Sequence, residues 1–241
     1  MESNNMKYDY LESVKRIDEV IASSDNSFEE LDSIPSRDKL TFTNGFYVYC
    51  SALFVDIRKS SELTSKHNTP KLAKLFRTYT SEVIALINGD PNCAEINVVG
   101  DCVSGIFNTP SKQDIDSTFG DAFRISSLID IMNYKFKQNG ITEITVGIGL
   151  SYGRALMVKA GYNGSGINDV VWMGDVVNEA AKLGGYGNKE YSDKEIMVSQ
   201  IFYQNLNDQN KGFLAWNSNR NCYHGNVVSE YMNNWYLQNC R

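Results

Sequence analysis

Two aspartates are the side chains of this sequence best suited to chemistry, because each lies where a predicted strand gives way to a turn. Asp56 follows the apolar segment 52–55, and Asp101 follows Gly100 after two valines. Two carboxylates at neighbouring strand ends can hold a divalent metal, since Mg²⁺ and Mn²⁺ prefer hard oxygen ligands. Taken alone, each aspartate is better explained as a turn residue, because aspartate favours turns through local hydrogen bonds.

The segments around these aspartates predict β-structure. Residues 51–56 are short, apolar and followed by the polar residues 58–61, which is typical of a buried central strand that feeds a turn. Residues 95–99 and 102–107 flank Gly100 and Asp101, and a glycine there can take the positive φ that hairpin turns require. We therefore expect Asp101 at the tip of a hairpin.

A second candidate for chemistry is the pair Asn178 and Lys182. Asp175 suits a helix N-cap and Gly184 suits the position just past a helix C-terminus, so a short helix is expected between them. Residues four apart share a helix face. A neutral donor beside a cation suits a polyphosphate whose charge rearranges during a reaction. The alternative is a surface asparagine and a lysine that the helix dipole favours in the last turn.

Apolar spacing predicts the elements that must support these residues. An amphipathic helix is expected over residues 6–24, then a polar connecting arm over 25–44 and a core that begins near Gly45. Asn68 or Thr69 with Pro70 starts a helix whose apolar face continues to residue 87. Further expected elements are a helix over 119–138, a hairpin of strands 142–151 and 154–159, a flexible loop over 161–166, and final strands from residue 213 that include Tyr231, Trp235 and Tyr236.

The order of these elements indicates an α+β fold with a mixed or antiparallel sheet and helices on one face. We expect an N-terminal helix and connecting arm over residues 1–44, and a catalytic domain over residues 45–241. The sequence contains no G-x-G-x-x-G and no G-x-x-x-x-G-K-[ST]. Neither a Rossmann fingerprint nor a P-loop is therefore available.

Composition excludes several classes of function. A net charge of −6 and a pI near 5.0 leave no basic stripe for a nucleic-acid backbone. The five cysteines form no C-x-x-C pair, which favours reduced thiols in the cytoplasm. The first residues lack a basic leader with an apolar stretch, and no run of about 18 apolar residues occurs. We expect a soluble, cytoplasmic protein with no nucleic-acid partner and no membrane insertion.

Four segments of the chain occur in a particular order. They are Phe-Val-Asp-Ile at 54–57, Val-Val-Gly-Asp at 98–101, Val-Gly-Ile-Gly-Leu-Ser-Tyr-Gly at 146–153 with Gly161, and Gly-Asp-Val-Val-Asn-Glu-Ala-Ala-Lys at 174–182. In order and approximate spacing they resemble the class III nucleotidyl cyclases, and the resemblance covers about residues 46–200. It implies a ferredoxin-like cyclase core that forms a head-to-tail homodimer with shared active sites.

The resemblance also implies roles for individual residues. Asp56 and Asp101 match the two metal-binding aspartates of the family, and the carbonyl of Ile57 is the expected third ligand. Two Mn²⁺ or Mg²⁺ ions per site are expected. Asn178 matches the asparagine that positions the ribose or the transition state, and Lys182 takes the place of an arginine that stabilises the pentavalent phosphorus. The metal pair and the Asn–Lys helix come from opposite subunits in this arrangement, so activity is expected to require the dimer.

The residues expected to contact the base differ from those of purine cyclases. Asn97 and Val171 stand where the resemblance places the purine-reading side chains, and neither fits an adenine or guanine pattern. This departure resembles the bacterial pyrimidine cyclases of antiphage defence, which use Mn²⁺ and signal to a separate cyclic-nucleotide-responsive effector. Tyr47, Tyr49 or Phe46 offers a stacking face for a pyrimidine, with core packing as the alternative for each.

The activity expected from this resemblance is a phosphoryl transfer within one nucleotide. The ribose 3′-hydroxyl of UTP attacks the α-phosphate in a two-metal site, which gives 3′,5′-cyclic UMP and pyrophosphate as a second messenger for antiviral defence. CTP is the second candidate substrate, because the sequence offers no physical discriminator between uracil and cytosine. A purine cyclase with displaced readers and a non-catalytic nucleotide-binding dimer are the remaining alternatives.

Overall fold

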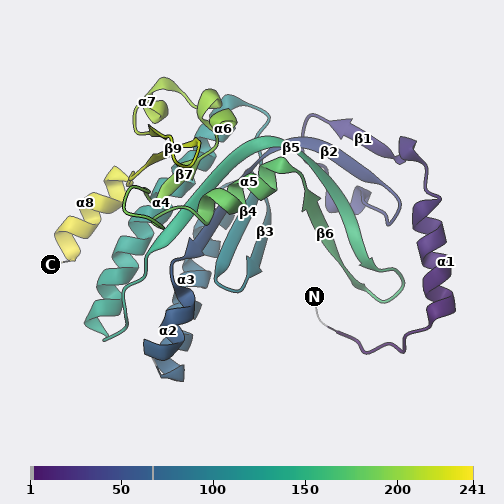
Figure 1. Cartoon of the computed structure of the whole chain (residues 1–241), viewed down its shortest axis with the longest axis horizontal. Coiled ribbons are helices and arrows are strands. Elements are labelled where there is room, and N and C mark those ends of the chain that lie inside the picture. Colours follow the sequence, from purple (N-terminus) through teal and green to yellow (C-terminus); the bar gives the residue numbers. More distant parts are fainter. Residues whose placement is uncertain (1–2, 67, 241) are drawn as a thin grey trace.

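Nine strands form one sheet in the computed structural model, which describes residues 3–66 and 68–240 (Figure 1). The main path is β3-β4-β2-β5-β7-β9-β8, while β1 pairs with β2 and β6 pairs with β5. The strands are β1 (Phe28–Leu31), β2 (Gly45–Ile57), β3 (Cys93–Val99), β4 (Cys102–Asn108), β5 (Val146–Tyr162), β6 (Ile167–Met173), β7 (Ile196–Val198), β8 (Ala215–Asn217) and β9 (Cys222–Gly225). The helices are α1 (Tyr10–Ile21), α2 (Ser60–Lys66), α3 (Thr69–Asn88), α4 (Lys112–Gln138), α5 (Asp175–Gly184), α6 (Gln200–Asn205), α7 (Asp208–Lys211) and α8 (Glu230–Asn239), with 3₁₀ turns at Asp25–Ser27 and Arg37–Lys39.

The two long central strands, β2 and β5, determine where the functional residues lie. They run antiparallel along the whole of β2, and β4 pairs antiparallel with the second half of β2. Asp56 is thereby placed opposite Gly147 of β5 and Cys102 of β4. Among the pairs of the described residues, β1–β2 and β5–β7 are parallel and the others are antiparallel. The expected α+β fold with a mixed, mostly antiparallel sheet is confirmed.

Strand β5 differs from the prediction. A hairpin turn was expected at residues 152–153, but one strand continues from Val146 to Tyr162. Residues 152 and 153 instead pair with residues 51 and 50 of β2, which begins at Gly45 and is long enough to keep β5 extended. The chain turns at residues 163–166, where Gly164 and Gly166 have φ angles of +88° and +78°.

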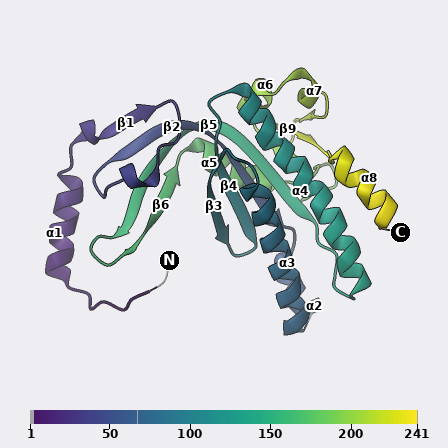
Figure 2. The ribbon, with the colours of Figure 1, turned by 180° about the vertical axis from the view of Figure 1, so that it is seen from behind.

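Helices α3 and α4 cover one face of the sheet and enclose the main core (Figure 2). The side chain of Asn68 caps α3 by accepting the N–H of Lys71, as predicted. Helix α4 begins earlier than the predicted residue 119, because Ser111 and Asp114 form a capping box. Full burial of each large apolar side chain contributes about 1.5–3 kcal/mol. The largest fully buried side chains here include Leu53, Leu75, Tyr79, Phe107, Phe119, Ile125 and Ile148.

Helix α5 lies on the opposite face, so the prediction that helices cover only one face is wrong. Val176 and Ala180 of α5 join a separate buried cluster above β2 and β5. Two glycines of β5 make this contact possible: a Cβ on Gly149 would lie 2.1 Å from the carbonyl oxygen of Ala180, and one on Gly147 would lie 2.2 Å from that of Gly184. The helix backbone therefore rests directly on the strand.

The N-terminal segment takes part in the sheet. Helix α1 forms within the predicted range. Residues 25–44, expected as a polar arm, contain β1, which pairs in parallel with residues 45–48 of β2. Arg37 then forms ion pairs with Glu95 of β3 (3.0 Å) and Asp169 of β6 (2.7 Å). Figure 1 shows α1 and β1 at one side of the molecule, beside β2 and the β5–β6 hairpin.

The C-terminal segment ends in a helix. Strands β8 and β9 form the antiparallel pair expected after residue 213, but Tyr231, Trp235 and Tyr236 lie in α8, so the prediction of strands there is wrong. The four-residue interval between Tyr231 and Trp235 is a helical spacing that their strand-favouring residue types obscured. Within the described part of the chain, no helix is both long and apolar enough to cross a membrane.

Candidate functional site

The two candidate metal-binding aspartates lie side by side at one end of the sheet. Asp56 is near the end of β2, opposite Cys102, and Asp101 immediately precedes Cys102 in the turn from β3 to β4. Gly100 has a φ of +65°, a value that favours glycine and closes this tight turn. The pairing of the strands therefore places both carboxylates at the same end of the sheet. Asp101 lies at the hairpin tip, as predicted.

The pKa values of residues at this end of the sheet reflect how close the two carboxylates lie. Partial burial raises the pKa of Asp56, the negative charge of Asp101 raises it further, and the nearby Arg58 guanidinium opposes both. Burial, together with the charges of Asp56 and Asp101, raises the pKa of the Cys102 thiol to about 12. The two carboxylates thus concentrate negative charge where the end of the sheet meets solvent, and a cation is the group that this field favours.

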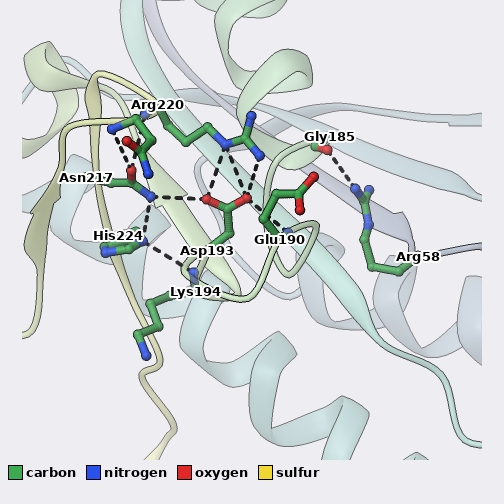
Figure 3. A network of polar contacts seen from close by, with 9 residues as sticks. Arg58, Gly185, Glu190, Asp193, Lys194, Asn217, Arg220 and His224 are labelled. Carbon is green, nitrogen blue, oxygen red and sulfur yellow. Dashed lines mark hydrogen bonds and ion pairs between the residues drawn. The ribbon is translucent and has the colours of Figure 1, made fainter.

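Arg58 supplies the positive charge that offsets the two carboxylates. From the sequence it was expected only as part of a polar turn. Its guanidinium pairs with the carboxylate of Asp56. It also donates to the main-chain carbonyl of Gly185 at 2.7 Å (Figure 3). The Arg58 side chain is 13% exposed and that of Asp56 is 34% exposed. Asp56 therefore remains reachable from solvent while Arg58 is largely covered. An arginine two residues after a strand-end aspartate was the available signal.

Two neighbouring residues fix the strand end. The Tyr79 hydroxyl on α3 donates to the main-chain carbonyl of Val55 at 3.0 Å, which ties the helix to the residue before Asp56. The side chain of Ile57 is buried in the main core, so only its main-chain carbonyl is available as a ligand. Tyr79 both packs in the core and positions the strand end. Helical spacing alone predicted only its place in the core.

Asn178 and Lys182 lie on the exposed side of α5. The helix begins one residue after Gly174, which is the N-cap residue in place of the predicted Asp175. Val176, Ala180 and Leu183 face the sheet, whereas Asn178 and Lys182 are exposed, as their four-residue spacing requires. The ammonium of Lys182 lies 5.8 Å from the ring centroid of Tyr186.

The helix residues and the aspartates do not meet within one subunit. Among the described residues, no hydrogen bond or ion pair joins Asn178 or Lys182 to Asp56 or Asp101. The only polar side-chain link between the aspartates and α5 in this part of the chain runs through Arg58 to Gly185. The Asn–Lys pair of α5 and the aspartate pair are thus two separate groups of side chains in the described subunit.

A buried polar network supports the loop after α5. Arg220 pairs with Asp193 at 2.7 Å (Figure 3). Its guanidinium also lies 4.4 Å from the ring centroid of Tyr186. Asn217 also donates to Asp193, at 3.2 Å. Burial acts to raise the pKa of Asp193, but the hydrogen bonds from Arg220 and Asn217 outweigh it and hold that pKa below its usual value. Arg220 therefore has a structural role beside the ring that also contacts Lys182.

Two of the candidate base-contacting residues lie on strands that the N-terminal arm bridges. Asn97 of β3 pairs with Ser104, which pairs in turn with Phe54, so Asn97 shares a sheet face with Asp56. Val171 of β6 is 39% exposed. Arg37 holds Glu95 and Asp169 together, and these residues lie two positions before Asn97 and Val171 on their strands. The bridge thus joins the strand surfaces that carry Asn97 and Val171.

Tyr47 lies elsewhere. It is seven residues before Phe54 on the continuous strand β2, and an odd separation places it on the opposite sheet face from Asn97. The Arg154 guanidinium lies 3.7 Å from the Tyr47 ring centroid, and Arg154 also pairs with Glu30 at 3.1 Å. The structure therefore brings Asn97 and Val171 onto bridged strands and gives the Tyr47 ring a partner of its own.

Comparison with known proteins places the chain in a family. The model described as the adenylate and guanylate cyclase catalytic domain matches residues 45–239. The chain belongs to the class III nucleotide cyclases. The matched segment starts at the first residue of β2, and it contains both aspartates of the sheet end and the whole of α5.

Two relatives of this cyclase carry the name uridylate cyclase. The protein from Treponema porcinum is 41% identical over 234 residues, which cover 95% of this chain and 81% of the relative. The protein from Gulbenkiania mobilis is 41% identical over 259 aligned positions, which cover 99% of this chain and all of the relative. The similarity therefore extends through the N-terminal arm as well as the cyclase domain.

Solved structures show the same fold at lower identity. A class III adenylyl cyclase-like ATP-binding protein from Pseudomonas aeruginosa superimposes with a TM-score of 0.71 at 16% identity, over 93% of this chain and 48% of that one. The adenylyl cyclase CyaB of P. aeruginosa gives a TM-score of 0.58 at 21% identity, over 71% of this chain and 85% of that one. These similarities confirm the class III cyclase fold of the sheet and its helices.

Proposed function

We propose that this cyclase converts UTP to 3′,5′-cyclic UMP and pyrophosphate. The observation that carries the proposal is the 41% identity, over nearly the whole chain, to two proteins named uridylate cyclase. The chain also retains two carboxylates at the sheet end and an Asn–Lys pair on α5. In this proposal residues 45–241 form the catalytic domain, and residues 1–44 form a helix and arm that pack on it.

Divalent metal suits the oxygen donors at the sheet end. Class III cyclases generally use divalent metal ions. Asp56 and Asp101 would hold two Mn²⁺ or Mg²⁺ ions with the main-chain carbonyl of Ile57, and the triphosphate oxygens would supply further ligands. Arg58 is the described side-chain partner of Asp56, and a bound metal ion would share that carboxylate with it. Bound metal would make the ribose 3′-hydroxyl more acidic and would neutralise charge on the leaving pyrophosphate.

Asn178 and Lys182 would complete the site from the partner subunit of a head-to-tail homodimer. Their exposure on α5, and the lack of a described contact with Asp56 or Asp101 in their own subunit, support this division. Asn178 would orient the ribose through its amide. Lys182 would stabilise the negative charge that grows on the α-phosphate oxygens, as a point charge rather than the planar fork that an arginine offers.

Asn97 and Val171 would face the base. An asparagine can both donate to and accept from a pyrimidine edge, and a valine offers an apolar wall without a charged group that would select a purine. Arg37 would hold this wall in place through Glu95 and Asp169. Tyr47 is left with a supporting role against Arg154, since its ring has that partner on the other sheet face.

The product would act as a second messenger in antiviral defence. Cyclic UMP made in the cytoplasm would diffuse to a separate effector that responds to it. This part of the proposal rests on the resemblance to bacterial pyrimidine cyclases and on the two relatives named uridylate cyclase.

The decisive experiment incubates the purified protein with Mn²⁺ and each of UTP, CTP, ATP and GTP, and identifies products by mass spectrometry. We expect cyclic UMP and pyrophosphate from UTP, in equal amounts, and no product after chelation of the metal. Cyclic CMP as the main product would move the assignment to cytosine, and a purine product would overturn pyrimidine selectivity. Lack of any cyclic product would contradict the proposed activity.

A further inference from the structure

Arg58 connects two parts of one subunit that serve different sites in the proposed enzyme. Its guanidinium pairs with Asp56. It also donates to the carbonyl of Gly185, the C-cap residue of α5 (Figure 3). Both contacts involve a charged donor that is largely covered from water, where such hydrogen bonds are strong. Arg58 therefore connects the strand end that carries Asp56 with the helix that carries Asn178 and Lys182, through one ion pair and one hydrogen bond.

We propose that Arg58 is a positioning residue that couples the two active sites of the cyclase dimer. The proposal rests on the proposed function, in which Asp56 serves one site and α5 of the same subunit serves the other. Without metal, Arg58 holds Asp56 and Gly185 together. When Asp56 binds a metal ion, its charge is shared with that ion, and Arg58 keeps only its contact with α5. Filling one site thereby changes how Asn178 and Lys182 are held in the other.

The chemistry of the bridge suits a link that can be rearranged. A planar guanidinium can contact a carboxylate and a carbonyl at once, whereas a lysine ammonium on a flexible stem lacks this geometry. The Nε of Arg58 is buried and has no hydrogen-bond partner among the described residues, so the terminal nitrogens carry the contacts. The main-chain N–H of Arg58 donates to Thr145 at 2.7 Å, which keeps the backbone fixed while the side chain changes partners.

Hydrogen exchange tests the link without turnover. The probe is Mn²⁺ with 3′-deoxy-UTP, which lacks the attacking hydroxyl, and the readout is amide exchange over residues 182–190. In the wild-type protein we expect exchange in this segment to change by about threefold or more when the probe is added. In Arg58→Gln, exchange should already be faster without metal and should not respond to it. Arg58→Lys, which keeps the charge but loses the fork, should behave like Arg58→Gln.

Two matched variants complete this experiment. Arg77→Gln removes one positive charge from the exposed side of α3 and should keep the wild-type response. Asp101→Asn weakens the metal site but leaves the Arg58 bridge, so exchange should stay slow with and without the probe. The coupling is wrong if Arg58→Gln and Arg58→Lys retain the full wild-type response. It is also wrong if wild-type exchange over 182–190 does not change although metal binding is detected by Mn²⁺ paramagnetic resonance.

Mixed dimers separate the two contacts of Arg58. A mixture of Asp101→Asn and Asn178→Ala subunits should recover about a quarter of wild-type activity, because half of the dimers carry one intact site of two. In the intact site, the Asn178→Ala subunit supplies the aspartates and the Asp101→Asn subunit supplies α5. Adding Arg58→Gln to the Asn178→Ala subunit should change the Mn²⁺ dependence. Adding it to the Asp101→Asn subunit should lower kcat and leave the Mn²⁺ dependence unchanged.

These outcomes distinguish the two proposals. If the two inactive variants do not complement each other while wild-type protein makes cyclic UMP, the shared-site dimer is wrong. If they complement each other and Arg58→Gln has the same effect in either subunit, the shared site is supported and the coupling by Arg58 is overturned. A wild-type protein that forms no cyclic product contradicts the proposed function itself, whatever the exchange experiment shows.

Discussion

The pair Asp56–Asp101 and the pair Asp90–Asp121 each bring two carboxyl groups together near an arginine, but they differ in their access to solvent. Asp56 is 34% exposed, and its one side-chain partner among the described residues is Arg58. Asp121 on α4 is fully buried, and Asp90, just after α3, is almost so. One pair is open for a ligand, and the other is closed by the protein.

Most carboxyl oxygens of the closed pair accept hydrogen bonds from neighbouring residues of the protein. Asp90 accepts the Asn92 main-chain N–H at 2.7 Å and the Ser117 hydroxyl at 3.0 Å. Asp121 accepts from Arg124 at 2.7 Å, while its other oxygen is buried with no hydrogen-bond partner in the described part of the chain. Burial, followed by the charge of Asp90, raises the pKa of Asp121 to about 8 despite Arg124. Adjacent carboxylates alone therefore do not make a metal site, which also needs access from solvent.

The largest effect should come from removing a carboxylate of the open pair. Asp101→Asn should lower the rate of cyclic UMP formation by about 10³-fold or more, because metal supplies several kcal/mol of transition-state stabilisation. Rates are measured by chromatography of the product at saturating Mn²⁺. The matched variant Asp90→Asn should keep its rate within about twofold, as a substitution remote from substrate. Equal losses in both variants would remove the functional distinction between the pairs.

A smaller loss should follow when the group that complements the open pair is removed. Lys182→Ala should reduce kcat by about 10²-fold, because a preorganised donor for the growing phosphate charge is lost. Lys189→Ala is the matched control. Its ammonium lies 5.9 Å from the Tyr186 ring centroid, much like that of Lys182, but Lys189 is outside α5. Steady-state kinetics should show an almost unchanged rate for the control, and an equal loss in both would assign the effect to Tyr186 packing.

The closed pair should be visible in the pH dependence of stability. Folding raises the pKa of Asp121 from 3.8 to about 8, so the folded state binds the proton more tightly than the unfolded state. Its contribution is greatest below about pH 4 and is lost as the pH rises towards 8. Asp121→Asn should gain on the order of 2 kcal/mol over wild type between pH 5 and pH 8.5, measured by urea unfolding. Parallel pH profiles would contradict a neutral buried carboxyl.

The smallest effects concern the glycine that precedes an aspartate in each pair. Gly100 has a φ of +65° with no atom within 4 Å of an added Cβ, so Gly100→Ala should cost about 1 kcal/mol through backbone conformation alone. Gly120 lies inside α4, where an added Cβ meets only ordinary contacts at 3.6 Å. Gly120→Ala should therefore stabilise the fold by about 0.5–1 kcal/mol. Thermal unfolding would detect both shifts, and shifts of the same sign would contradict this contrast.

Much of the fold could be predicted because local signals agreed with the final packing. The Asn68–Pro70 start of α3 and the Gly100–Asp101 turn are local features, and both were predicted correctly. The continuous strand β5 could not be predicted, since Gly153 resembles a turn residue until its pairing with β2 is known. The position of α5 on the second face likewise depends on the close approach of its backbone to Gly149.

The candidate site was predictable where chemistry follows from strand ends and helix spacing. Asp56 and Asp101 lie side by side, and Asn178 and Lys182 share the exposed side of α5. The bridge made by Arg37 and the contact of Arg58 with α5 emerged only in three dimensions, because they join residues more than 50 positions apart: Arg37 with Glu95 and Asp169, and Arg58 with Gly185. The pairing of Arg58 with Asp56 is local, since the two are only two residues apart. Catalytic roles for the two aspartates, Asn178 and Lys182 stay predictions, and the variants of Asp101, Asn178 and Lys182 test them.

Strand β1 has a consequence for how much of the chain the cyclase needs. It covers the edge of β2 at residues 45–48, where β4 no longer reaches. A protein shortened to begin at Gly45 would expose unpaired N–H and C=O groups along that edge, which are a template for pairing with another chain. It would also lose Arg37 and leave Glu95 and Asp169 without their shared counter-ion. A unit that keeps this edge of β2 covered therefore extends upstream of the family match, at least to Phe28.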